Sequence, residues 1–266
     1  MIGSVAGLRG GGGPLRVVRT AAGEPLADAA RTTALLRRAA DDPGAGAVLR
    51  LTTARPTIGF SRRDTLLSGF PAAVQAAGRH GYASVVRGPG GRAAAYHHGC
   101  LLLDHVSPDP QPHPALGRFE EVTHLLAAAL RSLGVDARVG PVPGEYCPGE
   151  FSVNAAGRVK LVGTAQRVVR GAWHLGAVIL VRDPEPVRTV LDEVYPALGL
   201  EWDPATVGAV EQGTGAGVDD VRDAVLEAYR GVLDLTDGAW PEGVEPDESM
   251  LDRHRPQRHG EGTTSS

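Results

Sequence analysis

Apolar residues recur at helical spacing in five segments of the chain. The clearest is residues 118–133, where they fall on one side of a helix and Gly134 supplies a stop. The same spacing predicts helices over residues 25–40, 70–80, 184–197 and 218–233. The apolar side of the clearest helix consists of Phe119, Val122, Leu125, Leu126, Ala129, Leu130 and Leu133.

Shorter apolar runs, separated by turns rich in glycine and proline, predict strands. Residues 47–61 divide into two short strands because Pro56 interrupts the run. Further runs lie at residues 83–87, 93–96 and 100–106, and the stretch 137–181 is rich in β-forming residues. Strands and helices are therefore mixed along the chain, without the regular alternation that is typical of a doubly wound fold.

This order of elements predicts a single domain of the α/β (α+β) class, with a mixed, largely antiparallel sheet flanked by helices. Residues 1–14 are rich in glycine and are expected to form a flexible N-terminus, and residues 15–236 are expected to form the domain. Residues 237–266 are rich in Pro, Glu, Arg, Gly and Ser, a composition typical of a disordered tail.

Composition narrows the classes of function. The formal charge of −4, without a basic stripe, argues against nucleic acid as a partner. No apolar run approaches the roughly 20 residues that span a bilayer, and the N-terminus does not resemble a signal peptide, so we expect no membrane partner and a cytoplasmic location. Two cysteines without CxxC or HxxxH spacing predict neither a metal site nor a structural disulfide.

Lys160 is the only lysine among 27 basic residues. The abundance of Ala, Gly, Pro and Arg indicates a coding bias that replaces lysine by arginine wherever a cation alone suffices. The surviving lysine is then either chance or a position that needs a primary amine. Its neighbours favour the second reading, because a lysine that alternates with Val and Leu in a strand can point inward and requires an oxygen partner there.

The two cysteines differ in their surroundings. Cys147 precedes Pro148 and Gly149, so it is expected on an accessible loop, where a thiolate is a strong nucleophile for acyl transfer. A small buried hydrophobe is the alternative for any cysteine. Cys100 begins an apolar run and fits that alternative better.

A glycine-rich turn at residues 87–92, RGPGGR, follows a predicted strand. Paired glycines permit close approach of a ligand, and Arg87 could bind a carboxylate or phosphate, but a plain hairpin turn explains the same residues. The turn matches neither a Walker A loop nor a dinucleotide fingerprint. His97, a few residues later, could be a base, a ligand or a surface residue.

Three of these segments together resemble one known family. GRVKLVGTAQ (157–166), RGPGGRAAA (87–95) and YCPGEFS (146–152) are similar to motifs of the lipoate–protein ligase and octanoyltransferase family, whose catalytic domain is related to that of biotin–protein ligases. The resemblance covers roughly residues 45–200. The cysteine, 13 residues before the lysine, is most similar to the octanoyl amidotransferase branch. That branch moves octanoyl or lipoyl groups between the glycine-cleavage H protein and the lipoyl domains of 2-oxoacid dehydrogenase complexes.

The resemblance implies a role for each matching residue. Cys147 would hold the acyl group as a thioester, and Lys160 would contact the acyl oxygen. The product would be an amide on the lysine of a lipoyl domain, formed without a cofactor. The acyl group would bind between two walls: Arg87, Gly90 and Gly91 on one side, lined also by His97, and Gly163, Thr164 and Ala165 on the other.

Two alternatives stay open from the sequence. An ATP-dependent lipoate–protein ligase would share Lys160 and the glycine loop but would need ATP and Mg²⁺. Arg92, where ligases often carry a third glycine, and His97-His98, where they often carry His-Asp, argue against that alternative. The other alternative is a non-catalytic member that binds an acyl chain or a lipoyl domain.

Overall fold

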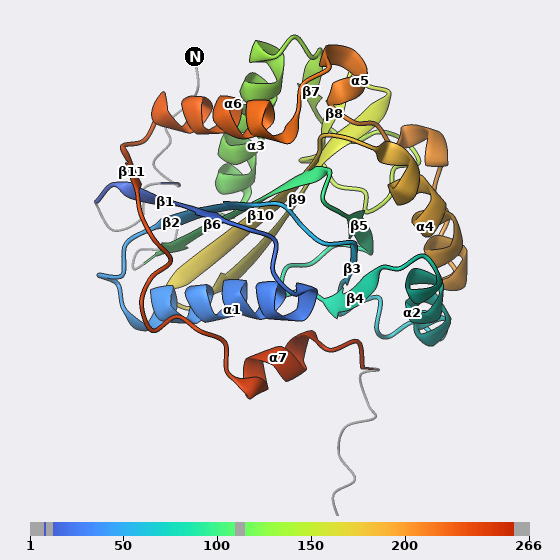
Figure 1. Cartoon of the computed structure of the whole chain (residues 1–266), viewed down its shortest axis with the longest axis horizontal. Helices are drawn as coiled ribbons and strands as arrows, with labels where there is room; N and C mark the ends of the chain where they lie inside the picture. Colours follow the sequence, from blue (N-terminus) through green and yellow to red (C-terminus); the bar gives the residue numbers. More distant parts are fainter. Residues whose placement is uncertain (1–7, 9–12, 110–114, 258–266) are drawn as a thin grey trace, which may run out of the picture.

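A large mixed sheet forms the centre of the molecule (Figure 1). The computed structural model describes residues 8, 13–109 and 115–257. The three strands at one edge run parallel to one another, and every other neighbouring pair is antiparallel. The spatial order is β11 (Leu235–Asp237), β1 (Leu15–Thr20), β2 (Val48–Thr52), β6 (Cys100–Pro108), β10 (Ala172–Leu180), β9 (Val159–Val169), β8 (Val153–Ala155) and β7 (Ala137–Val139).

Helices cover both faces of this sheet (Figure 1). One face packs on α3 (Ala115–Ser132) and α6 (Val218–Arg230) through an apolar core that includes Leu101 and Leu175. The opposite face packs on α1 (Pro25–Asp41). Because side chains alternate along a strand, β6 directs Leu101 toward α3 and α6, whereas Asp104 faces α1.

A second, smaller sheet lies beside the first and was not predicted as a separate unit. Its central strand β3 (Thr57–Phe60) is parallel to β4 (Ala83–Val86) and antiparallel to β5 (Ala94–Tyr96). Helices α2 (Phe70–Arg79) and α4 (Pro184–Ala197) pack against it around a separate apolar core. The remaining short helices are η2 (Pro204–Thr206), α5 (Glu211–Thr214) and α7 (Glu248–His254).

The structure confirms the predicted fold class and the five predicted helices. The prediction of a disordered tail over residues 237–266 is wrong for the described part of that segment. Met250 and His254 of α7 are buried, and Val244 packs in the core beneath α1. The composition predicted disorder because most residues of this segment are polar and exposed, whereas a few apolar residues anchor it to the core.

Residues 258–266 lie outside the described residues, as do residues 1–7 and 9–12 of the expected flexible N-terminus. Leu8, between them, is buried in the main core. None of the described helices is long and apolar enough to cross a membrane.

Candidate active site

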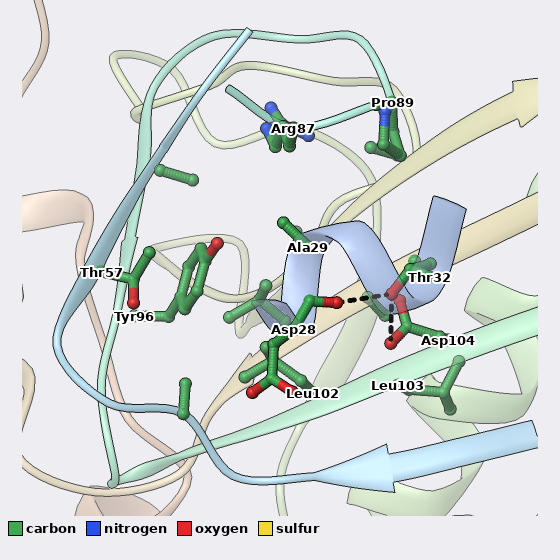
Figure 2. Close-up of a pocket in the computed structure, with 18 of the residues that line it drawn as sticks. Asp28, Ala29, Thr32, Thr57, Arg87, Pro89, Tyr96, Leu102, Leu103 and Asp104 are labelled. Atoms are coloured by element: carbon green, nitrogen blue, oxygen red, sulfur yellow. Dashed lines mark hydrogen bonds between the residues drawn. The ribbon is translucent and has the colours of Figure 1, made fainter. Parts of the chain in front are cut away.

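The main cavity lies between α1 and the large sheet, under the turn that follows β4. Figure 2 shows Arg87 and Pro89 on one side of it, and Asp28, Leu102 and Asp104 on the other. Residues from both sheets, from α1 and from α7 line it, so the cavity exists only where these elements meet.

Small residues on two adjacent strands of the large sheet form the floor of this cavity. Gly163 and Ala165 of β9 and Gly176 of β10 all line it. A Cβ atom at position 163 would lie 3.4 Å from Lys160 Cε, and one at position 176 would lie 3.3 Å from His174 Nε2. Glycine at these two positions therefore leaves space beside Lys160 at one place and beside His174 at the other.

Lys160 is buried at one end of the floor, with 1% of its surface exposed. Its Nζ donates to Glu145 Oε1 at 3.3 Å, to the Tyr146 carbonyl at 3.0 Å and to the Cys147 carbonyl at 2.8 Å. Burial lowers the pKa of Lys160, while the nearby Cys147 and Glu145 oppose that shift. The lysine therefore points inward and holds the segment that carries the cysteine.

Glu145 completes the anchor of this segment. Its fully buried carboxylate accepts hydrogen bonds from Val142 N, Gly149 N and Ser152 Oγ in addition to Lys160 Nζ. A buried charge is tolerated when it is paired and fully hydrogen-bonded, which is the case for this pair.

Cys147 faces the glycine-rich turn from this anchored segment, and its thiol is free. Its backbone has φ 43°, a left-handed conformation that costs a non-glycine residue about 1–3 kcal/mol. Its Sγ accepts hydrogen bonds from the Arg92 amide at 3.2 Å and from Arg87 Nη2 at 3.6 Å. A backbone N–H and a guanidinium at the sulfur complement a thiolate, the form that acts as a nucleophile.

The turn itself is shaped to approach the sulfur. Gly91 has φ 104°, and a Cβ there would lie 2.8 Å from Cys147 Sγ, so only glycine permits this approach. Asp64, which is fully buried, accepts from Arg92 Nη1 at 3.3 Å and holds the turn from behind. Gly88 and Pro89 of this turn line the cavity, whereas Gly90 and Gly91 do not. Gly91 borders the Cys147 sulfur instead.

The prediction that His97 lines the cavity is wrong. The side chain is 2% exposed, accepts a hydrogen bond from Gly99 N at 2.9 Å and donates to the Asp183 carbonyl at 3.0 Å. Burial lowers its pKa, and the ring holds a tight turn between β5 and β6. Tyr96, the preceding residue, lines the cavity.

Two features of the site left no local signal in the sequence. The first is Tyr195 of α4, whose hydroxyl accepts from Cys147 N at 2.6 Å and donates to the Ala93 carbonyl at 3.0 Å. The hydroxyl therefore joins the cysteine segment to the end of the glycine-rich turn. Tyr195 and Ala93 are 102 positions apart in the sequence.

The second feature is a polar group at the far end of the floor. His174 Nε2 lies 2.8 Å from Asp104 Oδ1, and Arg50 bonds Asp28 at 2.8 Å and Asp104 at 3.4 Å. Although burial opposes it, the hydrogen bond and charge of His174 hold the pKa of Asp104 below its ordinary value. Among the described residues, no cluster of three or more His, Cys, Asp or Glu is arranged to hold a metal.

The structure thus brings together seven of the nine residues expected at the site and leaves out Gly90 and His97. The Cys147 sulfur lies beside Arg87 and Gly91, and the Cys147 carbonyl is bonded by Lys160. Thr164 lines the floor with Gly163 and Ala165, and its hydroxyl donates to the Phe151 carbonyl at 3.0 Å.

The sequence profile of the lipoyl protein ligase A/B catalytic domain matches residues 24–230, and the chain belongs to this family. It is 30% identical over 181 residues to an octanoyl-[GcvH]:protein N-octanoyltransferase of Geobacillus kaustophilus, covering 66% of this chain and 64% of that protein. An enzyme of the same name from an Exiguobacterium species is 27% identical over 70% of this chain and 69% of its own length. The chain thus spans slightly less than two thirds of the first of these relatives.

Solved structures of the same family share the fold. A lipoate-protein ligase A bound with ATP has a TM-score of 0.68 at 19% identity, covering 90% of this chain and 92% of that one. A bipartite lipoate protein ligase from Thermoplasma acidophilum, studied with its E2 lipoyl domain, has a TM-score of 0.67 at 21% identity and covers 90% of each chain. The family and the fold that the three sequence motifs predicted are confirmed.

Proposed function

We propose that this protein transfers an octanoyl or lipoyl group to the lysine of a lipoyl domain through a thioester on Cys147. The observation that carries the proposal is the position of the Cys147 sulfur. It borders the main cavity and accepts hydrogen bonds from the Arg92 amide and the Arg87 guanidinium. The similarity to proteins named octanoyl-[GcvH]:protein N-octanoyltransferase supports the same activity.

The reaction divides into two acyl transfers. The Cys147 thiolate attacks the carbonyl carbon of the donor's acyl amide, a C–S bond forms, the C–N bond breaks, and the leaving lysine amine takes up a proton. The amine of the acceptor lysine then attacks the thioester. A new amide forms, the amine loses a proton, and the C–S bond breaks to return the thiolate.

The positions of these residues support a role for each of them. The acyl chain would lie on the floor formed by Gly163, Thr164 and Ala165, with its carbonyl near the thiol. Lys160 would keep Cys147 in its strained conformation and place a positive charge beside the acyl oxygen, where negative charge develops. The names of the relatives support an octanoylated glycine-cleavage H protein as the donor, and this route would use no cofactor.

Intact-mass measurement tests the proposal. The protein is mixed with octanoylated H protein in the absence of ATP, and we expect its mass to rise by one octanoyl group that hydroxylamine removes. Cys147→Ser should not gain the thioester, whereas the matched variant Cys100→Ser should gain it, because Cys100 is fully buried. Full transfer by Cys147→Ala would refute the thioester. Pyrophosphate release from lipoate and ATP would favour the ligase alternative.

A further inference from the structure

Three arginines from distant parts of the sequence lie near the segment 86–88, which leads from β4 into the glycine-rich turn. They are Arg62, which follows β3, Arg167 of β9, and Arg253 of α7. Phe60, two residues before Arg62, pairs with Val86. His254, next to Arg253, bonds the Val86 carbonyl, and Arg167 bonds the Gly88 carbonyl. Arg62 and Arg253 are exposed and Arg167 is half-buried. Among the described residues, none of the three forms an ion pair with an acid, although most other arginines of the chain do.

Arg167 fixes the position of this group relative to the site. Its side chain lines the main cavity, and its Nη1 donates to the Gly88 carbonyl at 3.4 Å, so it touches the turn that approaches the cysteine. Burial lowers the pKa of Arg167, and the charges of Arg62 and Arg253 lower it further.

A short turn holds Arg62 outward. Ser61 and Asp64 are buried and bonded to each other, since both the amide and the hydroxyl of Ser61 donate to Asp64 Oδ2, at 2.8 and 2.9 Å. The two arginines between them are therefore directed to solvent. Asp64 also binds Arg92, which links this surface turn to the loop beside Cys147.

His254 anchors the helix that carries Arg253. The ring of His254 is buried, lines the main cavity, donates from Nδ1 to the Val86 carbonyl at 2.6 Å and accepts from the Thr33 hydroxyl at 2.8 Å. This clamp joins α7 to both β4 and α1. Because α7 lies beyond residues 24–230, an element outside the span that matches the family contributes both a wall of the cavity and a surface charge.

We infer that Arg62, Arg167 and Arg253 form a docking surface for the acidic face of the protein domain that carries the acyl group. The inference rests on the proposed function, in which the acyl group arrives on a lysine of another protein. Three guanidinium groups that form no ion pair within the described part of the chain lie beside the turn that approaches the cysteine, and they complement carboxylates around that lysine. The chain as a whole carries a charge of −4, so attraction of an acidic domain requires a local group of arginines such as this one.

The test compares two acyl donors. Octanoylated H protein is the protein donor, and the octanoyl thioester of N-acetylcysteamine, which has no charge, is the small donor. With Arg62→Glu/Arg253→Glu, we expect acylation of Cys147 by the protein donor to fall at least about tenfold at low salt, while acylation by the small donor stays within about twofold. The wild-type rate with the protein donor should fall as salt rises, and the variant should lose most of this dependence.

Arg158→Glu/Arg230→Glu is the matched control, because it changes the net charge equally at exposed positions of the β8–β9 turn and the end of α6. The inference is overturned if the control slows the protein donor as much as the test variant does. It is also overturned if both donors slow equally, or if neither slows. Failure of the wild-type protein to accept octanoyl from either donor would instead refute the proposed function.

Discussion

Replacement of Lys160 by methionine removes the ammonium and keeps most of the side-chain volume. The change leaves the Glu145 carboxylate, whose side chain is fully buried, without its counter-charge, and leaves the Tyr146 and Cys147 carbonyls without a donor. Removal of one partner of a buried ion pair costs about 3–5 kcal/mol. A domain of this kind has a free energy of unfolding of about 5–15 kcal/mol, so Lys160→Met is expected to fold with greatly reduced stability.

A double-mutant cycle separates the charge from the lost packing. Glu145→Gln in the Lys160→Met background removes the unpaired charge and should recover about 1–3 kcal/mol of the lost free energy of unfolding. Glu145→Gln alone should destabilise, because it leaves the ammonium buried without its anion. The free energies are measured by guanidinium denaturation of all four proteins at pH 7.5.

The same variant should also lose its reactive cysteine. Without the Lys160 bond to its carbonyl, Cys147 is expected to relax from its left-handed conformation, and acylation should fall at least about a hundredfold, as for other misplaced reacting groups. Additive free energies across the cycle, or a loss of stability below about 1 kcal/mol for Lys160→Met, would refute the account of the lysine as an anchor.

Three further predictions concern groups that tertiary structure brings into place. Tyr195→Phe removes the hydroxyl that joins Cys147 to Ala93 and should lower the free energy of unfolding by about 1–2 kcal/mol and slow thioester formation. Gly91→Ala introduces a Cβ 2.8 Å from Cys147 Sγ at a positive φ, so alkylation of the thiol by iodoacetamide should change rate strongly, with little change in global fold by circular dichroism. Burial lowers the pKa of His105 from 6.5 to about 3, so its contribution to stability is present above pH 6.5 and is lost as the pH falls toward 3. When the pH is lowered from 7 to 5, the free energy of unfolding should therefore fall by about 2 kcal/mol less in His105→Phe than in the wild type.

Each of these predictions has an outcome that contradicts it. Wild-type acylation by Tyr195→Phe would show that the two loops hold their geometry without the bridge. Unchanged alkylation of Gly91→Ala would mean that the turn does not approach the sulfur closely. Phenylalanine is a suitable replacement because both ring nitrogens of His105 lack a hydrogen-bond partner among the described residues. Equal loss of stability in acid by His105→Phe and wild type would assign that loss to other groups.

The predictions from sequence succeeded where the signal is local. Helical spacing over residues 118–133 requires only that one side be apolar, and the structure places a helix there from Ala115 to Ser132. The position of Cys147 before Pro-Gly is local in the same sense, because a cysteine there lies on a loop whatever surrounds it. Lys160 could be singled out because one amine among many guanidinium groups is visible in the sequence itself.

What only the tertiary structure decided depends on contacts between distant segments. His97 and Tyr96 are adjacent, and no local pattern says which of the two faces the cavity. Tyr195 reaches Cys147 only because α4 packs beside the small sheet. The polar composition of residues 237–257 could not reveal that four apolar side chains, Trp240, Val244, Met250 and Leu251, pack this segment against α1.

The sequence by itself therefore determined the family, the class of fold, and the cysteine and lysine at its centre, because these rest on short motifs and regular spacing. The tertiary structure decided how the lysine acts, since its three oxygen partners become neighbours only when β9 lies against the cysteine segment. It also decided that Arg167 lies beside the glycine-rich turn, because β9 and that turn become neighbours only on folding.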